Sequence, residues 1–511
     1  MTGALIDQPL DRVTKRINKI GCGNSQIFTC LIAVLVGLCD GQEMLVMSLI
    51  SLRLKDVWKL TPIQEGTLGS CVFAGVLFGS IFAGGLADKY GRRTTLISFQ
   101  LILAICGLLS SIAPAFTYLI IIRTLAGFGL GGIIPTISCV VSECVPDKSR
   151  AITMLLVGMG FTVGECVTAL EAMFLNVNLG SNWRWLLAIS AAPAFISVII
   201  TMLYLDESPR YLNAIGEKEE CDAILNKMER QNKLPLCCSF CCCYRNEHDP
   251  EENKKVWEGI DNLENDDNDE FGSSARTSLL NAEKNVIKDL NNENDETNVS
   301  SEQSCCENNQ LVELFESARP LDTIMIWIIF AVNSTIFYGL IWIFPITLKE
   351  GGGQEDNTGV SSKVLYGALA ELPSVIIPLL VIDWLGRRGT IRLAYTVCIP
   401  MAVACAFLAP NLSSGSISRA FFWCVMGLKC TIAIAFSVGY IFAAEYVPSS
   451  VRGFAIGMSS ATARLGGIAT PYAMVLFHRT YIGSPYWFIA GACILGFIAT
   501  WIVNEVSKHM R

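Results

Sequence analysis

The sequence predicts an all-helical membrane protein with twelve transmembrane helices, built from two repeated halves. Its 511 residues are 52% hydrophobic and only 16% charged, whereas soluble domains carry about 25% charged residues. The mean hydropathy is +0.46, and the apolar residues gather in long runs. Two short charged motifs each occur twice, at nearly the same spacing along the chain. These three observations indicate a polytopic membrane protein and argue against a soluble enzyme.

Twelve apolar runs are long enough to cross a bilayer, which takes roughly 20 mostly apolar residues. The first run contains Asp40 and Glu43 and has no clear cleavage pattern of small residues, so we expect a retained helix and not a signal peptide. The runs lie at 27–50, 64–86, 94–113, 116–143, 151–175, 183–205, 322–348, 361–383, 391–409, 417–444, 453–477 and 484–504.

A long polar segment at 206–321 separates the sixth run from the seventh. Its part at 246–310 holds 18 Asp or Glu against 5 Lys or Arg, a net charge of −13, which leaves −8 − (−13) = +5 for the rest of the chain. This part is too polar to bury an apolar core, so we expect it to be disordered. The predicted organisation is a membrane unit at 1–205, the central loop, and a second membrane unit at 322–511.

The distribution of Lys and Arg predicts the orientation in the membrane. With an even number of helices, both termini lie on one side. Outside the central loop, 15 Lys or Arg occur in the terminal segments and the loops on their side, against about 8 in the opposite loops. We therefore expect both termini and the central loop to be cytoplasmic, in the plasma membrane or an endomembrane.

A cysteine cluster, "LCCSFCCCY" at 236–244, opens the polar part of the central loop. No His or second Cys pair has zinc-finger spacing around it, so the cluster does not indicate a metal site. Palmitoylation near the membrane is one hypothesis, and an unmodified loop is the alternative. The candidate residues are Cys237, Cys238, Cys241, Cys242 and Cys243.

Two motifs relate the halves of the chain. "DKYGRR" begins at Asp88 and "DWLGRR" begins at Asp383, 295 residues later. "ECVPDKSR" begins at Glu143 and "EYVPSSVR" begins at Glu445, 302 residues later. Two different motifs at nearly one offset, each at the same end of corresponding runs, indicate a duplicated unit of six helices.

These motifs, with "RTLAGFGLGG" (123–132) and "DESPRYL" (206–212), make the chain resemble a transporter of the major facilitator superfamily. "CDGQEMLVMS" (39–48) and "ARLGGIATPY" (463–472) narrow the resemblance to synaptic-vesicle-protein-like, organic cation, organic anion and niacin-type transporters. Sugar porters are a looser match. The resemblance implies two six-helix bundles, a solute site near the membrane midplane and alternating access.

The repeated charged residues predict a cytoplasmic gate. Arginine guanidinium groups bind carboxylates in a bidentate manner, so pairs between the bundles would hold that side shut and break when it opens. The alternative is a set of solvated charges that only fixes the orientation. The gate candidates are Asp88, Arg92, Arg93, Glu143 and Arg150 in the first half, and Asp383, Arg387, Arg388, Glu445 and Arg452 in the second.

A charged residue within an apolar run costs free energy when it enters the membrane, so a functional role is the default expectation. Asp40 and Glu43 lie three residues apart, on one face of the first helix. Arg123 of the fourth helix lies at a depth similar to that of Glu43, and the resemblance implies that these helices are neighbours. A buried carboxylate beside an arginine can exchange a proton, which gives a proton-coupling hypothesis. A static pair that only neutralises charge is the alternative.

In the second half, Lys429 and Arg464 lie within predicted helices. Arg464 occupies the place where, by resemblance, organic-anion transporters carry an arginine that faces the substrate; a pair with Glu445 or another helix-end acid is the alternative. Lys429 lines the pore or is paired. Glu165 of the fifth helix is deep enough to face the cavity, and free acids there would instead suit a cation. Aromatic residues that could line the cavity include Tyr338, Trp342 and Tyr366.

The expected partners are therefore a small organic solute, protons as the coupling ion in one hypothesis, and the lipid bilayer. The favoured solute is a carboxylate or vitamin such as nicotinate or pantothenate; an organic cation, a sugar, and a non-transporting receptor on the same fold are the alternatives. The sequence shows no Walker lysine motif, no metal spacing among its three His and no catalytic triad. We expect no cofactor, no enzymatic activity and no nucleic-acid partner, and favour a monomer.

Overall fold

The computed structural model shows a helical protein and describes residues 12–175, 183–233, 314–315, 319–351, 357–412, 415–446 and 452–503. Within these ranges there is no β-strand. The cysteine cluster and the acidic part of the central loop lie outside the described residues, so palmitoylation and disorder stay predictions.

The first six predicted runs each form a helix or a pair of helices, as the sequence predicted. The sixth run is interrupted near Ser190 and gives two shorter pieces. The helices are α2 (Asn24–Trp58), α3 (Pro62–Tyr90), α4 (Arg92–Ser111), α5 (Phe116–Cys144), α6 (Asp147–Phe174), and the pair α7 (Trp183–Ser190) and α8 (Ala192–Tyr204). Together they form the N-terminal bundle.

The second six runs form the C-terminal bundle. The eighth run consists of α16 and the first part of α17, and the ninth run is the rest of α17, which turns at Gly386. The helices are α15 (Pro320–Gly351), α16 (Asn357–Leu369), α17 (Pro373–Leu408) with a short 3₁₀ turn η1 (Ala409–Asn411), α18 (Gly415–Tyr446), α19 (Arg452–Thr480) and α20 (Ser484–Ile502).

Ten stretches of the described chain are long and apolar enough to cross a membrane. The two remaining predicted runs are helical but less regular or less apolar. The run at 361–383 is interrupted by turns at 370–372, and α19 is rich in Ser, Thr and Gly and carries Arg464. Both features place polar groups within the membrane-spanning part of the protein.

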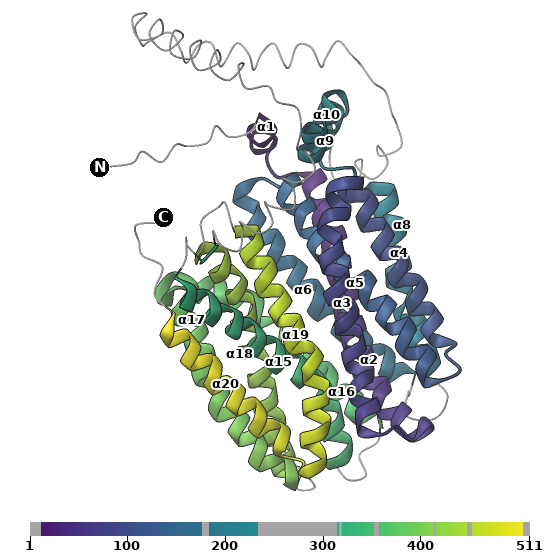
Figure 1. Ribbon diagram of the computed structural model, residues 1–511, viewed down its shortest axis with the longest axis vertical. Coiled ribbons are helices and arrows are strands. Elements are labelled where there is room, and N and C mark those ends of the chain that lie inside the picture. The colour runs from purple at the N-terminus through teal and green to yellow at the C-terminus, as the bar shows by residue number, and fades with distance from the viewer. Residues whose placement is uncertain are drawn as a thin grey trace, which may run out of the picture.

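The two bundles lie side by side, and three further helices gather at one end of them (Figure 1). These are α1 (Arg12–Ile20), α9 (Pro209–Ile215) and α10 (Lys218–Lys233). Arg16 of α1 donates to Asp222 of α10 at 3.2 Å. We call this end of the molecule the α10 end and the opposite end the far end. The start of the central loop is therefore helical.

Glycines at 127–132 allow the helices of the N-terminal bundle to pack closely. A Cβ atom at Gly127 or Gly131 would lie 2.2 Å from a backbone oxygen of α3. A Cβ atom at Gly129 or Gly132 would clash with α4. One glycine-rich stretch of α5 therefore brings it against two neighbouring helices, a common use of small residues in membrane bundles.

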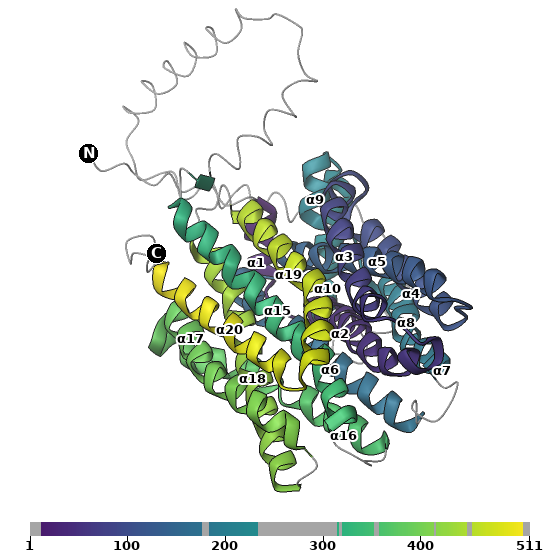
Figure 2. The same ribbon diagram turned by 60° about the horizontal axis from the view of Figure 1, so that its bottom comes forward.

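The bundles are joined in the half of the molecule near the far end. Ser48 of α2 donates to the carbonyl oxygen of Ile341 of α15 at 2.9 Å, and Ser70 of α3 donates to that of Ile468 of α19 at 2.6 Å. Helices α6 and α16 also contact each other there, as the second view shows (Figure 2). These contacts hold the far end shut in this conformation.

Candidate functional site

Charged side chains from both bundles meet near the middle of the interface. The first group lies within the N-terminal bundle, where Arg123 of α5 donates to the Glu43 carboxylate of α2. Both residues are buried, with Arg123 only 1% exposed. The predicted neighbourhood of the first and fourth spans is therefore confirmed, and the pair satisfies two charges that would be costly alone.

The second group includes Arg464 of α19. Its guanidinium donates to the Tyr338 hydroxyl of α15 at 3.3 Å, and it interacts electrostatically with Asp40 of α2. Among the described residues, no carboxylate lies within ion-pair distance of Arg464. Arg464 is half-buried, whereas Asp40 is buried. A guanidinium with five donors and one hydroxyl partner has capacity left for a ligand.

The third group consists of Lys429, Glu165 and Glu371. The Lys429 ammonium lies 3.2 Å from a carboxylate oxygen of Glu165 and 2.6 Å from one of Glu371. Lys429 belongs to α18, Glu165 to α6, and Glu371 to the turn between α16 and α17. The sequence left open whether Lys429 lines the pore or is paired, and the structure shows that it is paired. We call these three residues the Lys429 triad.

Glu371 is the member of this site that the sequence analysis missed. It is 1% exposed and lies inside the apolar run at 361–383. The same criterion that selected Asp40, an acid within a predicted span, would have found it. The turn at 370–372 brings the Glu371 carboxylate to Lys429.

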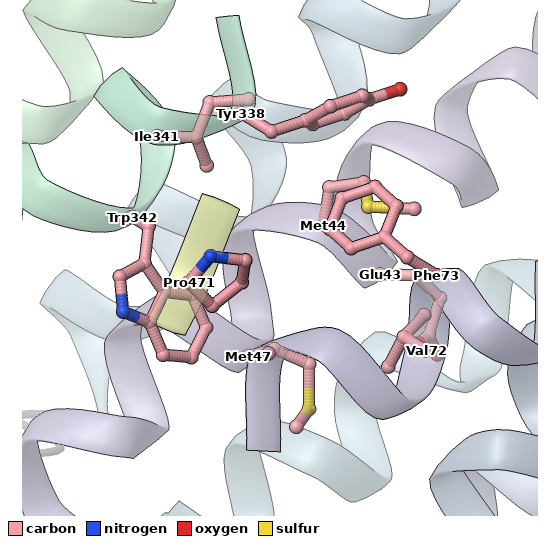
Figure 3. A pocket seen from close by; sticks show the side chains of 10 residues that line it. Glu43, Met44, Met47, Val72, Phe73, Tyr338, Ile341, Trp342 and Pro471 are labelled. Atoms are coloured by element: carbon pink, nitrogen blue, oxygen red, sulfur yellow. The ribbon is translucent and has the colours of Figure 1, made fainter. Parts of the chain in front are cut away.

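A small cavity lies between the bundles, and Glu43 is one of the residues that line it. Tyr338, Ile341 and Trp342 of α15 lie on one side of it, and Glu43 and Phe73 lie on the other (Figure 3). Its volume is about 20 Å³, which is enough for one water molecule. The prediction that Tyr338 and Trp342 line a cavity is confirmed, but this cavity is too small for an organic solute in the present conformation.

Tyr366 does not line this cavity. Its side chain is 57% exposed, and its ring packs edge-on against Phe422 of α18. The sequence placed Tyr366 among the possible cavity residues because it lies in an apolar run; the helix instead turns Gly367 toward the bundle interior, where it faces Phe344.

The predicted gate residues of the N-terminal bundle pair with groups of their own bundle in this conformation. Arg92 donates to both carboxylate oxygens of Glu143, at 3.2–3.3 Å, and approaches Asp88 at 3.2 Å. Arg93 donates to the carbonyl oxygen of Met202 at 2.7 Å. Arg150 lies in the first turn of α6. In this conformation Arg92 and Arg93 therefore do not form the expected pairs with the other bundle.

In the C-terminal bundle, Arg388 repeats the contact of Arg93. It donates to the carbonyl oxygens of Thr500 and Trp501 at 2.8 and 2.7 Å, at the end of the last helix. Arg387 follows the turn at Gly386. The side chains of Asp383, Glu445 and Arg452 lie outside the described part of the structure, so their role in a gate stays a prediction.

Sequence comparison now identifies the family. A profile of the Major Facilitator Superfamily matches residues 32–432. The chain belongs to the Major Facilitator Superfamily. It is thus an integral, multi-pass membrane protein of a transporter family, as the resemblance implied.

Curated relatives place the chain near several kinds of transporter. It is 30% identical to Organic cation/carnitine transporter 7 of Arabidopsis thaliana, over 91% of this chain and 88% of the relative. It is 24% identical to the Synaptic vesicle 2-related protein of Rattus norvegicus, over 97% and 81% of the two chains. It is also 24% identical to the niacin transporter NiaP of Acinetobacter baylyi, over 96% of each chain.

Among solved structures, the xylose transporter XylE from E. coli in a partially occluded inward open conformation has the same fold. The TM-score is 0.67, at 15% identity, over 94% of this chain and 98% of XylE. At this identity the likeness establishes the major facilitator fold and leaves the solute open.

Proposed function

We propose that this superfamily member transports a small organic solute that bears a carboxylate, such as a nicotinate- or pantothenate-like vitamin, together with protons. The observation that carries the proposal is the half-buried Arg464, whose partner is the Tyr338 hydroxyl and not a carboxylate. A fixed guanidinium at the bundle interface can bind a solute carboxylate in a bidentate manner. The printed name of the niacin relative supports this solute class.

Proton coupling rests on the buried acids beside this arginine. Asp40 interacts electrostatically with both Arg464 and Glu43. When a solute carboxylate binds Arg464, it competes with the favourable interaction between Arg464 and Asp40. Protonation of Asp40 would then remove the repulsion between Asp40 and the solute. The solute and the proton would therefore favour each other's binding, which is the requirement for symport.

An organic cation is the second candidate. The seven charged residues of the three central groups comprise four acids (Asp40, Glu43, Glu165 and Glu371) and three bases (Arg123, Lys429 and Arg464), so acids exceed bases by one. The printed name of the Arabidopsis relative also includes organic cations. A cation would bind Asp40, and its uptake would survive the loss of Arg464.

The orientation supported by the Lys and Arg distribution places the α10 end, with both termini and the central loop, in the cytoplasm. We propose a location in the plasma membrane or an endomembrane. A protease-accessible tag inserted in the central loop should be cleaved in permeabilised cells and protected in intact cells; cleavage in intact cells would reverse the orientation.

Uptake into proteoliposomes tests the proposed solute class. The full-length protein is reconstituted and offered radiolabelled nicotinate, tetraethylammonium or xylose, with and without an inward proton gradient and a protonophore. We expect nicotinate uptake that rises with the gradient and collapses with the protonophore. Uptake of tetraethylammonium alone would favour the second candidate and contradict the first.

Arginine variants on one helix make the test specific. Arg464→Gln should lower carboxylate uptake at least about tenfold, because a hydrogen bond to a charged group contributes about 1.5–3 kcal/mol. Arg464→Lys should retain part of the uptake. Arg479→Gln is the matched control, since Arg479 lies on the same helix but is exposed near its end. An equal loss in both glutamine variants would contradict the role of Arg464.

A further inference from the structure

The Lys429 triad joins the two bundles by charge. Glu165 comes from the N-terminal bundle, and Lys429 and Glu371 come from the C-terminal bundle. The exposed fractions of the side chains are 0% for Glu165, 2% for Glu371 and 5% for Lys429. The triad lies where α6 meets α16, in the contact that helps to close the far end. It is therefore part of the contact that must open during transport.

The charges of the triad do not balance. Two carboxylates against one ammonium leave a net charge of −1 in a site without access to water, and such a charge is costly inside a membrane. The two carboxyl groups also interact directly with each other, and Glu165 Oε1 is buried without a hydrogen-bond partner. Two carboxylates that share one site resist joint ionisation.

One bound proton removes the net charge, the repulsion between the two carboxylates and the missing hydrogen bond. A protonated carboxyl group donates to its neighbour, which supplies the missing hydrogen bond between the two glutamates. The triad then carries one ammonium, one carboxylate and one neutral acid, and its net charge is zero. Lys429 remains charged in this arrangement and holds the ionised carboxylate.

We propose that the Lys429 triad is a proton-binding site, in which one exchangeable proton shared by Glu165 and Glu371 holds the two bundles together. The proposal rests on the proposed function, because it adds a second proton site to a proton-coupled transporter. The proton enters from water on one side of the membrane and is released as a proton to water on the other side. Its release leaves both carboxylates ionised, and their repulsion favours separation of α6 from α16.

The triad differs from the Glu43–Arg123 pair in what its protonation changes. Glu43 and Arg123 match one to one and belong to the same bundle, so a proton there breaks an ion pair within one bundle. Among the residues that the structure describes, the other titratable groups that face the triad are Asp40 of α2, Cys166 of α6 and Cys430 of α18. None of these supplies a second cation that would balance the two glutamates.

Infrared difference spectroscopy of the purified full-length protein detects the proton directly. A protonated carboxylic acid has a C=O stretching band that a carboxylate lacks. We expect Glu165→Gln and Glu371→Gln to remove the same band, because in either variant the remaining carboxylate pairs one to one with Lys429. Glu171→Gln is the control on the same helix; Glu171 binds Gln42 and Ser190, and its variant should keep that band.

Hydrogen–deuterium exchange tests the effect on the bundle contact. After correction for the intrinsic exchange rate, deuterium uptake in peptides of α6 and α16 should increase as the pH rises in the wild-type protein and in Glu171→Gln. It should become independent of pH in Glu165→Gln and in Glu371→Gln, which have no proton to lose.

Three results would overturn the inference: no carboxylic-acid band in the wild type, a band that survives both triad variants, or exchange in α6 and α16 that keeps its pH dependence in those variants. Neither measurement needs a solute or a gradient. Both triad measurements can succeed while solute uptake does not depend on the proton gradient. In that case proton coupling in the proposed function is wrong, but the triad still binds a proton.

Discussion

The two bundles carry the same turn and use it in the same way. Gly91 and Gly386 both have positive φ, at 89° and 73°, with extended ψ of 158° and 168°, a region that only glycine readily adopts. Two residues after each glycine, Arg93 and Arg388 bind carbonyl oxygens at the end of the last helix of their bundle. The duplication therefore preserved a structural contact within each bundle.

The bundles differ in how they neutralise buried cations. In the N-terminal bundle, Arg123 has Glu43 as a partner from the same bundle. In the C-terminal bundle, Lys429 contacts Glu371 of its own bundle at 2.6 Å and Glu165 of the opposite bundle at 3.2 Å, and Arg464 has a hydroxyl partner. Arg123 is thus neutralised within its own bundle, whereas Lys429 and Arg464 also interact with acids of the opposite bundle.

The largest expected effect is the loss of Arg123. Arg123→Leu leaves the buried Glu43 carboxylate without its partner, and breaking a buried ion pair by removing one member costs about 3–5 kcal/mol. We expect little folded protein in detergent and a large drop in Tm, measured by the unfolding of the purified protein. The double variant Glu43→Gln with Arg123→Leu should recover most of the loss. If the double variant is no more stable than the single one, the loss does not come from an unpaired Glu43 carboxylate.

The gate is the next test, because it compares the two copies of one motif. Glu445→Gln and Arg452→Ala should each cut transport about tenfold or more, the effect of losing a charged hydrogen bond, while the protein still reaches its membrane. Glu143→Gln should lower stability as well, since Glu143 already binds Arg92 in its own bundle. Transport is measured in proteoliposomes and membrane delivery by surface labelling. Normal uptake by both C-terminal variants would exclude the gate.

A smaller difference is expected between the two turn glycines. Alanine at either position incurs backbone strain of about 1–3 kcal/mol. At Gly91 the added Cβ would also lie 2.4 Å from Glu207 Oε2, and Glu207 accepts from the backbone N–H of Arg92 at 2.8 Å. Nothing lies within 4 Å of a Cβ at Gly386. Gly91→Ala should therefore lower Tm more than Gly386→Ala, and equal shifts would show that Glu207 moves aside freely.

The smallest effect is expected from Tyr338→Phe. It removes the one hydroxyl that positions Arg464, and a single hydrogen bond contributes about 0.5–1.5 kcal/mol. The KM for the carboxylate should rise about two- to tenfold without a change in Tm. Tyr486→Phe is the control, because it removes a comparable buried hydrogen bond, to Thr347 at 3.2 Å. A KM that rises equally in both variants would indicate a general loosening of the C-terminal bundle.

Much of the fold could be predicted because its signals are local. Apolar runs located the twelve spans, and two motifs revealed the duplication. The depth of Glu43 and Arg123, together with the neighbouring helices that the family resemblance implied, was enough to predict their pairing. The interruption at 370–372 was not predicted, because the apolar run continues through Glu371 and conceals the turn.

The sequence by itself determined which charged residues lie within the membrane spans. Both the apolar runs and the charged residues inside them can be read directly from it. Only the tertiary structure decided their partners. Glu165 and Lys429 are separated by 264 residues, and their contact exists because α6 docks against α16, which in turn contacts α18. Arg464 lies beside Tyr338 for the same reason, since α15 and α19 pack together. Coulomb attraction and hydrogen bonding act over a few ångströms, so the docking of whole helices determines which charges meet.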